Sequence, residues 1–173
     1  MRATLPLVPA VLDAIAPTPV LAAGGIGDGR GIAAALALGA AGVVVGTRFC
    51  VAEEALMHPS AQRRLLSARG GDTVRTRVFD IVRGYNWPAS YTGRALRNEF
   101  LTRWHGFDAD LAQDAGERER YQSAVEKGDF ETGVIWAGEC VEMLDRVEPA
   151  ATILDQMGID AEAWLRRAAA LIG

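Results

Sequence analysis

The chain has 173 residues, of which 50% are hydrophobic and 23% are charged, and its formal net charge is −4. This composition is ordinary for a globular domain, and the acidic balance argues against a nucleic-acid-binding surface. No apolar run approaches the ~20 residues that a membrane-spanning helix needs, so we expect no membrane partner. Cys50 and Cys140 lie far apart without metal-ligand spacing, and no signal peptide is recognisable. We therefore expect a reduced, cytoplasmic setting and no metal site.

The first third of the chain predicts a βαβ unit. Residues 5–15 have helical periodicity, with Pro9 expected in the first turn. The apolar run 19–23 then has the length of a strand buried on both faces. A helix is expected over 31–38, and a second buried strand over 42–45. Two strands joined by one helix predict parallel pairing.

Short polar and glycine signals mark the ends of these elements. Asp28 is expected to cap the N-terminus of the 31–38 helix, and Gly39 is expected to end it.

Glycine turns follow both predicted strands. Gly24 and Gly25 come directly after the first, and Gly46 and Thr47 after the second. Ligands of α/β folds bind at the carboxyl edge of the strands, where backbone N–H groups and the positive end of a helix suit an anion. Thr47 adds a hydroxyl donor. The pattern predicts a phosphate site, and the alternative is that these glycines serve only tight turns.

The middle of the chain has weaker patterns. Residues 51–57 and 59–68 are expected to be helical, with His58 as a cap or turn residue between them. Residues 73–82 alternate like an edge strand of an added subdomain. The loop 83–89 is rich in aromatic residues, which are expected either to lie over an active-site mouth or to anchor the loop onto the fold.

A helix is expected to run from residue 94 to about Trp104. Arg94, Arg97 and Asn98 at its start are interpreted first as ion-pair and hydrogen-bond residues and second as cofactor contacts. His105 follows Trp104 at a helix-end position, where a cation is favourable.

The last third is expected to be helical and acidic. The apolar stretch 134–144 places Trp136, Cys140 and Leu144 four residues apart, as on one face of a helix. Residues 149–157 and 160–171 are expected to form two closing helices, the second capped by Asp160. Cys140 and Cys50 are expected to be buried, apolar side chains, and a reactive thiol next to the predicted phosphate site is the alternative for Cys50.

Several of these stretches carry the motifs of a known family. They read AAGGIGDGRG, AALALG, GVVVGTRF, NWPASYTGRALRNEF, RWHG and WAGE, in that order along the chain. The chain therefore resembles the nitronate monooxygenases, the former 2-nitropropane dioxygenases, which are FMN-dependent TIM barrels. A complete barrel typically needs ~250 residues. The resemblance implies an α/β fold, the C-terminal portion of a TIM (β/α)8 barrel with about two strands in 1–68, followed by a mostly helical subdomain with one short strand in 69–173.

The resemblance also implies a cofactor, a reaction and its partners. The FMN phosphate and ribityl end would contact Gly24, Gly25, Val44, Val45, Gly46 and Thr47. Many members carry Gln at position 44 and Met at 45, so Val44 departs from the family there. The family reaction is oxidation of an alkyl nitronate by O2 to a carbonyl compound and nitrite. Its catalytic His is expected upstream of this chain, so no catalytic residue is assigned within it.

The sequence leaves two alternatives open. One is another FMN-barrel oxidoreductase, such as an enoyl reductase or a dehydrogenase. The other is an inactive structural fragment, whose unpaired strand edges would form a homo-oligomer or an aggregate.

Overall fold

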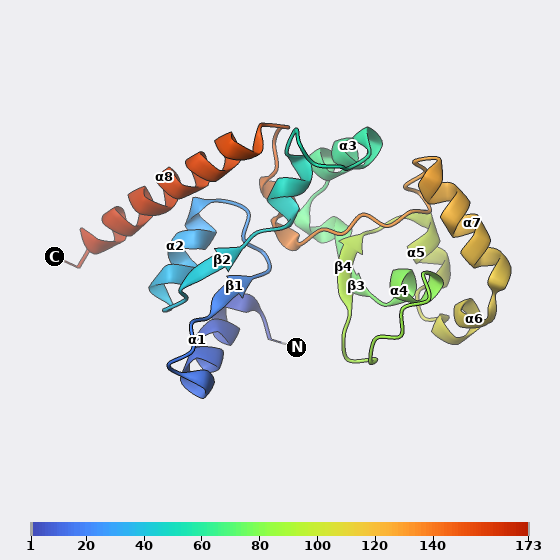
Figure 1. Ribbon diagram of the computed structural model, residues 1–173, viewed down its shortest axis with the longest axis horizontal. Coiled ribbons are helices and arrows are strands. Elements are labelled where there is room, and N and C mark those ends of the chain that lie inside the picture. Colours follow the sequence, from blue (N-terminus) through green and yellow to red (C-terminus); the bar gives the residue numbers. More distant parts are fainter. Residues whose placement is uncertain (1, 173) are drawn as a thin grey trace. The chain divides into compact units, whose positions relative to one another are not determined.

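The computed structural model describes residues 2–172, which fall into two compact units (Figure 1). Unit 1 contains residues 2–56 together with 143–172, and unit 2 contains residues 57–142. This division differs from the sequence-based boundary after residue 68. Both ends of the chain share unit 1 because the C-terminal helix packs against the N-terminal βαβ segment.

Unit 1 contains the predicted βαβ unit. Its elements are α1 (Thr4–Ile15), β1 (Leu21–Ala23), α2 (Gly29–Ala37), β2 (Gly42–Val44), the 3₁₀ helix Thr47–Val51 and α8 (Ala150–Ala169). The two strands pair in parallel, with Leu21 opposite Gly42 and Ala23 opposite Val44. Gly39 ends the α2 region with a φ of +95°, so the predicted parallel strands, helix and helix stop are confirmed. The expected burial of both strands on both faces was wrong, because Leu21 is 58% and Val44 is 54% exposed.

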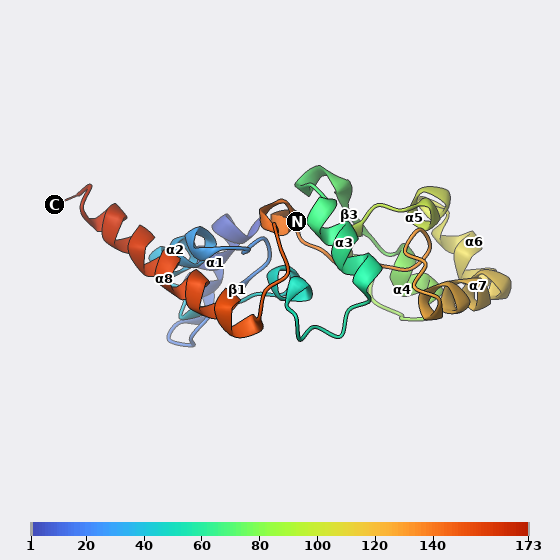
Figure 2. The same ribbon diagram turned by 90° about the horizontal axis from the view of Figure 1, so that it is seen from above.

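The core of unit 1 lies between this βαβ unit and α8. Val8 of α1, Ala22 of β1 and Ala35 of α2 belong to one buried cluster with Ile153 and Met157 of α8. The views in Figures 1 and 2 show α8 lying along α2. The apolar face of α8 therefore covers the same core that the strands and α1 line.

Two expectations about the helices α1 and α8 were wrong. A single helix, α8, replaces the two closing helices, because Gly158 continues the helix and Asp160 accepts a hydrogen bond from Gln156 Nε2 inside it. Pro9 lies inside α1 and not in its first turn, because the helix begins earlier, at Thr4.

The helix expected over residues 51–57 does not form after the 3₁₀ helix. Ala52 forms a parallel bridge with Glu148, and the Glu53 N–H donates to the Glu148 carbonyl at 2.9 Å. Pairing with a distant segment therefore holds Ala52 extended, and a turn follows at residues 53–54.

Unit 2 is mostly helical around a small antiparallel sheet. Its elements are α3 (Pro59–Ser67), β3 (Thr73–Thr76), α4 (Val78–Val82), β4 (Gly93–Leu96), α5 (Glu99–Trp104), α6 (Asp108–Gln113) and α7 (Ala115–Glu126). Thr73 pairs with Leu96 and Thr76 with Gly93. The core is aromatic, and the Phe79 ring contacts those of Phe100 and Tyr121.

The expected strand 73–82 is wrong in its second half. The strand ends at Thr76, whose Oγ1 accepts a hydrogen bond from the Val78 N–H at 3.0 Å and starts α4. The helix expected from residue 94 is likewise wrong in its first residues. Residues 93–96 form β4, and α5 begins after Asn98, whose Oδ1 accepts from the Leu101 N–H at 2.9 Å.

The stretch 134–144 is not the expected helix. Trp136 forms an antiparallel bridge with Ala95, and the Leu96 N–H donates to the Ile135 carbonyl at 2.9 Å. Only the 3₁₀ helix Glu139–Met143 is helical here. An extended conformation is favoured because β4 has a free edge whose backbone groups need partners.

None of the helices described for residues 2–172 combines the length and apolar character needed to cross a membrane.

Candidate functional site

The carboxyl end of β1 carries the first glycine turn. Gly24 and Gly25 have φ values of +101° and +76°, a region that glycine adopts at little cost and other residues rarely adopt. Both residues are exposed, whereas Ala22 just before them is buried. The chain therefore leaves the core at this point through a conformation that requires glycine.

The second turn lies at the same edge of the sheet. Ala23 is opposite Val44 in the parallel register, so Gly24 and Val45 leave neighbouring strands side by side. Gly46 is exposed and precedes the 3₁₀ helix that begins at Thr47. The structure thus brings the two predicted turns together, while their role in binding a cofactor stays a prediction.

The space in front of these turns is open. A Cβ atom added to Gly25 or to Gly46 would meet no heavy atom within 4 Å, whereas one on Gly24 would lie 3.3 Å from Thr4 Oγ1. Thr4 Oγ1 instead donates to the Gly24 carbonyl at 2.8 Å and holds the turn. Val44 is 54% exposed, so its side chain is not needed for the core. This arrangement fits the close approach of a phosphate group to the backbone.

The N-terminus of α2 is occupied by a side chain of this chain. Asp28 accepts hydrogen bonds from the Arg30 and Gly31 N–H groups at 3.0 and 3.2 Å, and from Arg30 Nε at 2.7 Å. Burial acts to raise the pKa of Asp28, but these hydrogen bonds and the Arg30 charge outweigh it and lower the pKa. The predicted N-cap is confirmed. An anion at this edge would therefore rest on the strand-end turns, because the Asp28 carboxylate already takes the end of the helix.

Replacing Asp28 with alanine is expected to destabilise unit 1 by ~1 kcal/mol at neutral pH through loss of the cap. Because the folded state lowers the pKa from the ordinary 3.8, this contribution is present above that value and disappears as the pH falls through the folded-state pKa. Denaturant unfolding of both proteins from neutral pH downward measures the difference. Asp155→Ala, at an exposed position of α8 that caps no helix, is the control. A difference that does not change with pH would contradict the prediction.

Arg48, which follows Thr47, has a structural role. It is only 8% exposed, and its Nη2 lies 2.5 Å from Glu148 Oε2 while Nη1 donates to the Arg146 carbonyl at 3.4 Å. The Arg146 side chain, followed by Arg48, lowers the pKa of the Glu148 carboxyl. The guanidinium of Arg48 thus joins the 3₁₀ helix to the segment before α8.

Cys50, half-buried in the same 3₁₀ helix, forms no disulfide.

The candidate site residues of unit 2 mainly stabilise its fold. Arg94 forms an ion pair with Glu139 at 3.0 Å, and Asn98 Nδ2 donates to the carbonyls of Phe130 and Gly133 at 3.2 and 3.0 Å. The structural interpretation of Arg94 and Asn98 is therefore confirmed. The Arg97 side chain is exposed, and its backbone N–H donates to the Asp72 carbonyl at 2.8 Å.

Both histidines lie at helix ends. His58 precedes α3, and its Nδ1 accepts from the Ser60 N–H at 3.2 Å, while His105 ends α5. The expectations that His58 caps a helix and that His105 lies at a helix end are confirmed.

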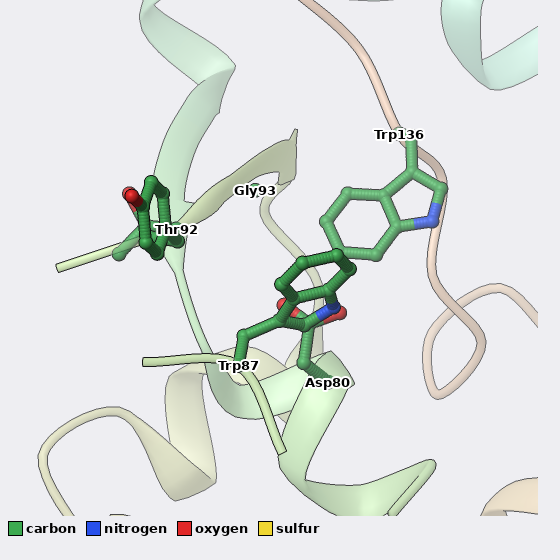
Figure 3. Close-up of a pocket in the computed structure, with 6 residues that line it drawn as sticks. Asp80, Trp87, Thr92, Gly93 and Trp136 are labelled. Atoms are coloured by element: carbon green, nitrogen blue, oxygen red, sulfur yellow. The ribbon is translucent and has the colours of Figure 1, made fainter. Parts of the chain in front are cut away.

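Sequence reasoning missed one pocket in unit 2, shown in Figure 3. It has a volume of about 320 Å³ and is lined by Asp80, Trp87, Tyr91, Thr92, Gly93 and Trp136. The aromatic residues of the loop 83–89 were the sequence feature that indicated this pocket. The pocket was not predicted because its other walls were assigned to a continued strand and to a helix, neither of which forms.

The chain is similar to known proteins over most of its length. The family model described as nitronate monooxygenase matches residues 2–160. A nitronate monooxygenase of Metarhizium robertsii is 37% identical over 95% of this chain and 48% of its own length. An indene-carboxyl-CoA dehydrogenase of Mycobacterium tuberculosis is 32% identical over 98% of this chain and 58% of its own length.

The structural comparison agrees with the sequence comparison. A nitroalkane oxidase from Streptomyces ansochromogenes superposes with a TM-score of 0.77 and 28% identity, over 96% of this chain and 45% of that protein. The chain therefore spans about half the length of the proteins it matches. The predicted fold class, part of a TIM barrel with added helices, is confirmed. The chain belongs to the nitronate monooxygenase family.

Proposed function

We propose that this protein takes part in the FMN-dependent oxidation of alkyl nitronates by O2, which forms a carbonyl compound and nitrite. The family match over residues 2–160 supports this reaction. The observation that carries the proposal is the meeting of two exposed glycine turns at the carboxyl edge of the parallel β1–β2 pair. Phosphate-bearing cofactors bind at this edge in barrels and in open α/β sheets.

The chain's own part is to hold the phosphate end of the cofactor. The residues proposed for this contact are Gly24, Gly25, Val44, Val45, Gly46 and Thr47. Backbone N–H groups at the turns suit an anion, and the Thr47 hydroxyl adds a donor. FMN would supply the redox chemistry, while the protein supplies binding and orientation. Neither His58 nor His105 is assigned as the base, because each serves a helix end.

Gly46→Asp is expected to weaken FMN binding at least about tenfold, because a carboxylate would project into the open space beside the phosphate. The substitution leaves folding intact, since the φ of Gly46 is −106° and a Cβ meets nothing within 4 Å. Flavin absorbance that co-elutes with the protein on gel filtration measures binding. Gly71→Asp, at another glycine with open space in front of it, is the matched control.

Riboflavin separates the phosphate contact from contacts to the flavin ring. If the glycine turns hold the phosphate, FMN is retained and riboflavin, which lacks the phosphate, is lost on the column. Equal retention of the two, or equal retention of FMN by Gly46→Asp and wild type, would contradict the proposed site.

A dehydrogenase acting on a CoA thioester is the second candidate. The 32% identity to the carboxyl-CoA dehydrogenase of Mycobacterium tuberculosis, over 98% of this chain, favours it. The nitronate reaction is preferred because the family model and the 37% identical relative both point to it. Nitronate-dependent O2 consumption with release of nitrite would support the first candidate. Reduction of bound flavin by an acyl-CoA, without nitronate turnover, would support the second.

A further inference from the structure

One pocket of unit 2, lined in part by Asp80 and Trp136, combines aromatic walls with one carboxylate. Trp87, Tyr91 and Trp136 supply the rings, and Asp80 supplies the acid (Figure 3). Its volume of about 320 Å³ is at the lower end for small-molecule sites. All of its walls come from unit 2, and none of the proposed flavin contacts belongs to it.

One wall of this pocket is rigid. Trp136 lies over Gly93, where a Cβ atom would come within 2.2 Å of the indole Cζ3. The Trp136 ring also meets the Phe79 ring edge-on, with the centroids 6.0 Å apart, and its backbone bridges Ala95. Because contacts on both sides hold it, this indole face is preorganised.

The opposite wall comes from a loop that is fixed at both ends. Arg75 Nη1 donates to the Thr92 carbonyl at 3.0 Å, and the Tyr85 N–H donates to the Asp80 carbonyl at 2.8 Å. Trp87 and Tyr91, which this loop carries, are 57% and 63% exposed. Two large aromatic rings thus stay open to solvent beside a preorganised indole, an arrangement typical of a binding surface.

Asp80 forms no direct ion pair with a side chain of the described residues. Within residues 2–172 its half-buried carboxylate forms no hydrogen bond or ion pair, and Figure 3 shows it pointing toward the tryptophans. The nearby arginines have other contacts: Arg77 pairs with Asp108 at 3.6 Å, and Arg83 lies 4.7 Å from the Tyr85 ring centroid. Burial raises the pKa of Asp80, against the opposing charges of Arg83 and Arg77. A bound cation would supply a direct partner.

We propose that this pocket binds a small organic cation, an alkylated ammonium group. Aromatic faces attract a cation through the ring quadrupole, and a carboxylate in the lining of the pocket adds charge complementarity. Alkylation is expected because the rings offer apolar faces, whereas a primary ammonium would need several hydrogen-bond acceptors. None of the pocket residues is among those proposed to hold the flavin, and the proposal does not depend on the proposed oxidation.

Choline chloride is the test ligand, titrated into the full chain at constant ionic strength and followed by calorimetry. The neutral carbon analogue, in which a tert-butyl group replaces trimethylammonium, separates charge from shape. Saturable binding of choline is expected, with the analogue at least about tenfold weaker. Equal affinities would show an apolar pocket without cation preference and would overturn the proposal, as would the absence of choline binding.

Variants connect the binding to the pocket. Asp80→Asn is expected to weaken choline about tenfold and to leave binding of the neutral analogue unchanged, since only the charge is removed. Trp87→Leu, at an exposed position where folding is not at risk, is expected to weaken choline by a similar factor. Trp164→Phe, in α8 of unit 1, is the control and should bind like wild type. Choline binding that survives both pocket variants unchanged would overturn the assignment.

Discussion

Phe79→Ala is expected to destabilise unit 2 by ~3–5 kcal/mol, which is the usual cost of removing a buried aromatic ring. The Phe79 side chain is 0% exposed, and its ring contacts those of Phe100, Tyr121 and Trp136. The cavity that it leaves cannot close easily, because its neighbours come from α5, α7 and the segment beside β4. The same loss frees one side of Trp136, so the aromatic pocket should lose its rigid wall.

Tryptophan fluorescence during urea unfolding measures this change. Trp87, Trp104 and Trp136 lie in unit 2 and Trp164 in unit 1, so a Trp164→Phe background makes the signal report unit 2 alone. Phe107→Ala is the matched control, because that ring is 56% exposed and its loss should change stability little. Similar midpoints for both phenylalanine variants would show that the aromatic cluster is not the core of this unit.

Gly29→Ala is expected to destabilise unit 1 by ~1–3 kcal/mol through overpacking between α2 and α8. The added Cβ would lie 2.5 Å from the Ala161 backbone nitrogen and 2.5 Å from Asp160 Cβ. Backbone cannot move aside as a flexible side chain can, so α8 would have to shift away from α2. That shift would open the core that supports both glycine turns, and retention of FMN should fall with stability.

A second glycine gives the opposite sign in the same unit. Gly158 lies inside α8, and a Cβ there would meet nothing within 4 Å. Gly158→Ala should therefore stabilise the helix by ~0.5–1 kcal/mol. Thermal unfolding and hydrogen exchange of α2 and α8 peptides would measure both variants. Equal effects of the two substitutions would show that the close helix contact at Gly29 does not limit stability.

The βαβ unit could be predicted from the sequence because its signals are local. The glycines at 24 and 25 need a positive φ, Asp28 bonds to the first turn of its own helix, and Gly39 ends that helix. Each of these choices is made within a few residues along the chain. Parallel pairing of β1 with β2 then follows from the length of the crossover, and it places the two turns at one edge.

Unit 2 could not be predicted in the same way. Residues 73–82 alternate like one strand, yet the chain turns into α4 after Thr76, because the hydroxyl of that residue caps the turn and Val78, Phe79 and Val82 are needed in the core. The stretch 134–144 has helical spacing of its apolar residues, but it pairs in an extended conformation with the open edge of β4.

The sequence by itself therefore determined the family, the parallel strand pair and the turns proposed to hold a phosphate. Tertiary structure alone decided which short segments of unit 2 pair, and it placed Asp80 beside Trp87 and Trp136. The physical reason is the separation along the chain between the residues that interact. Caps and glycine turns draw their free energy from neighbours in the chain, whereas a short strand or an aromatic pocket gains its free energy from partners tens of residues away.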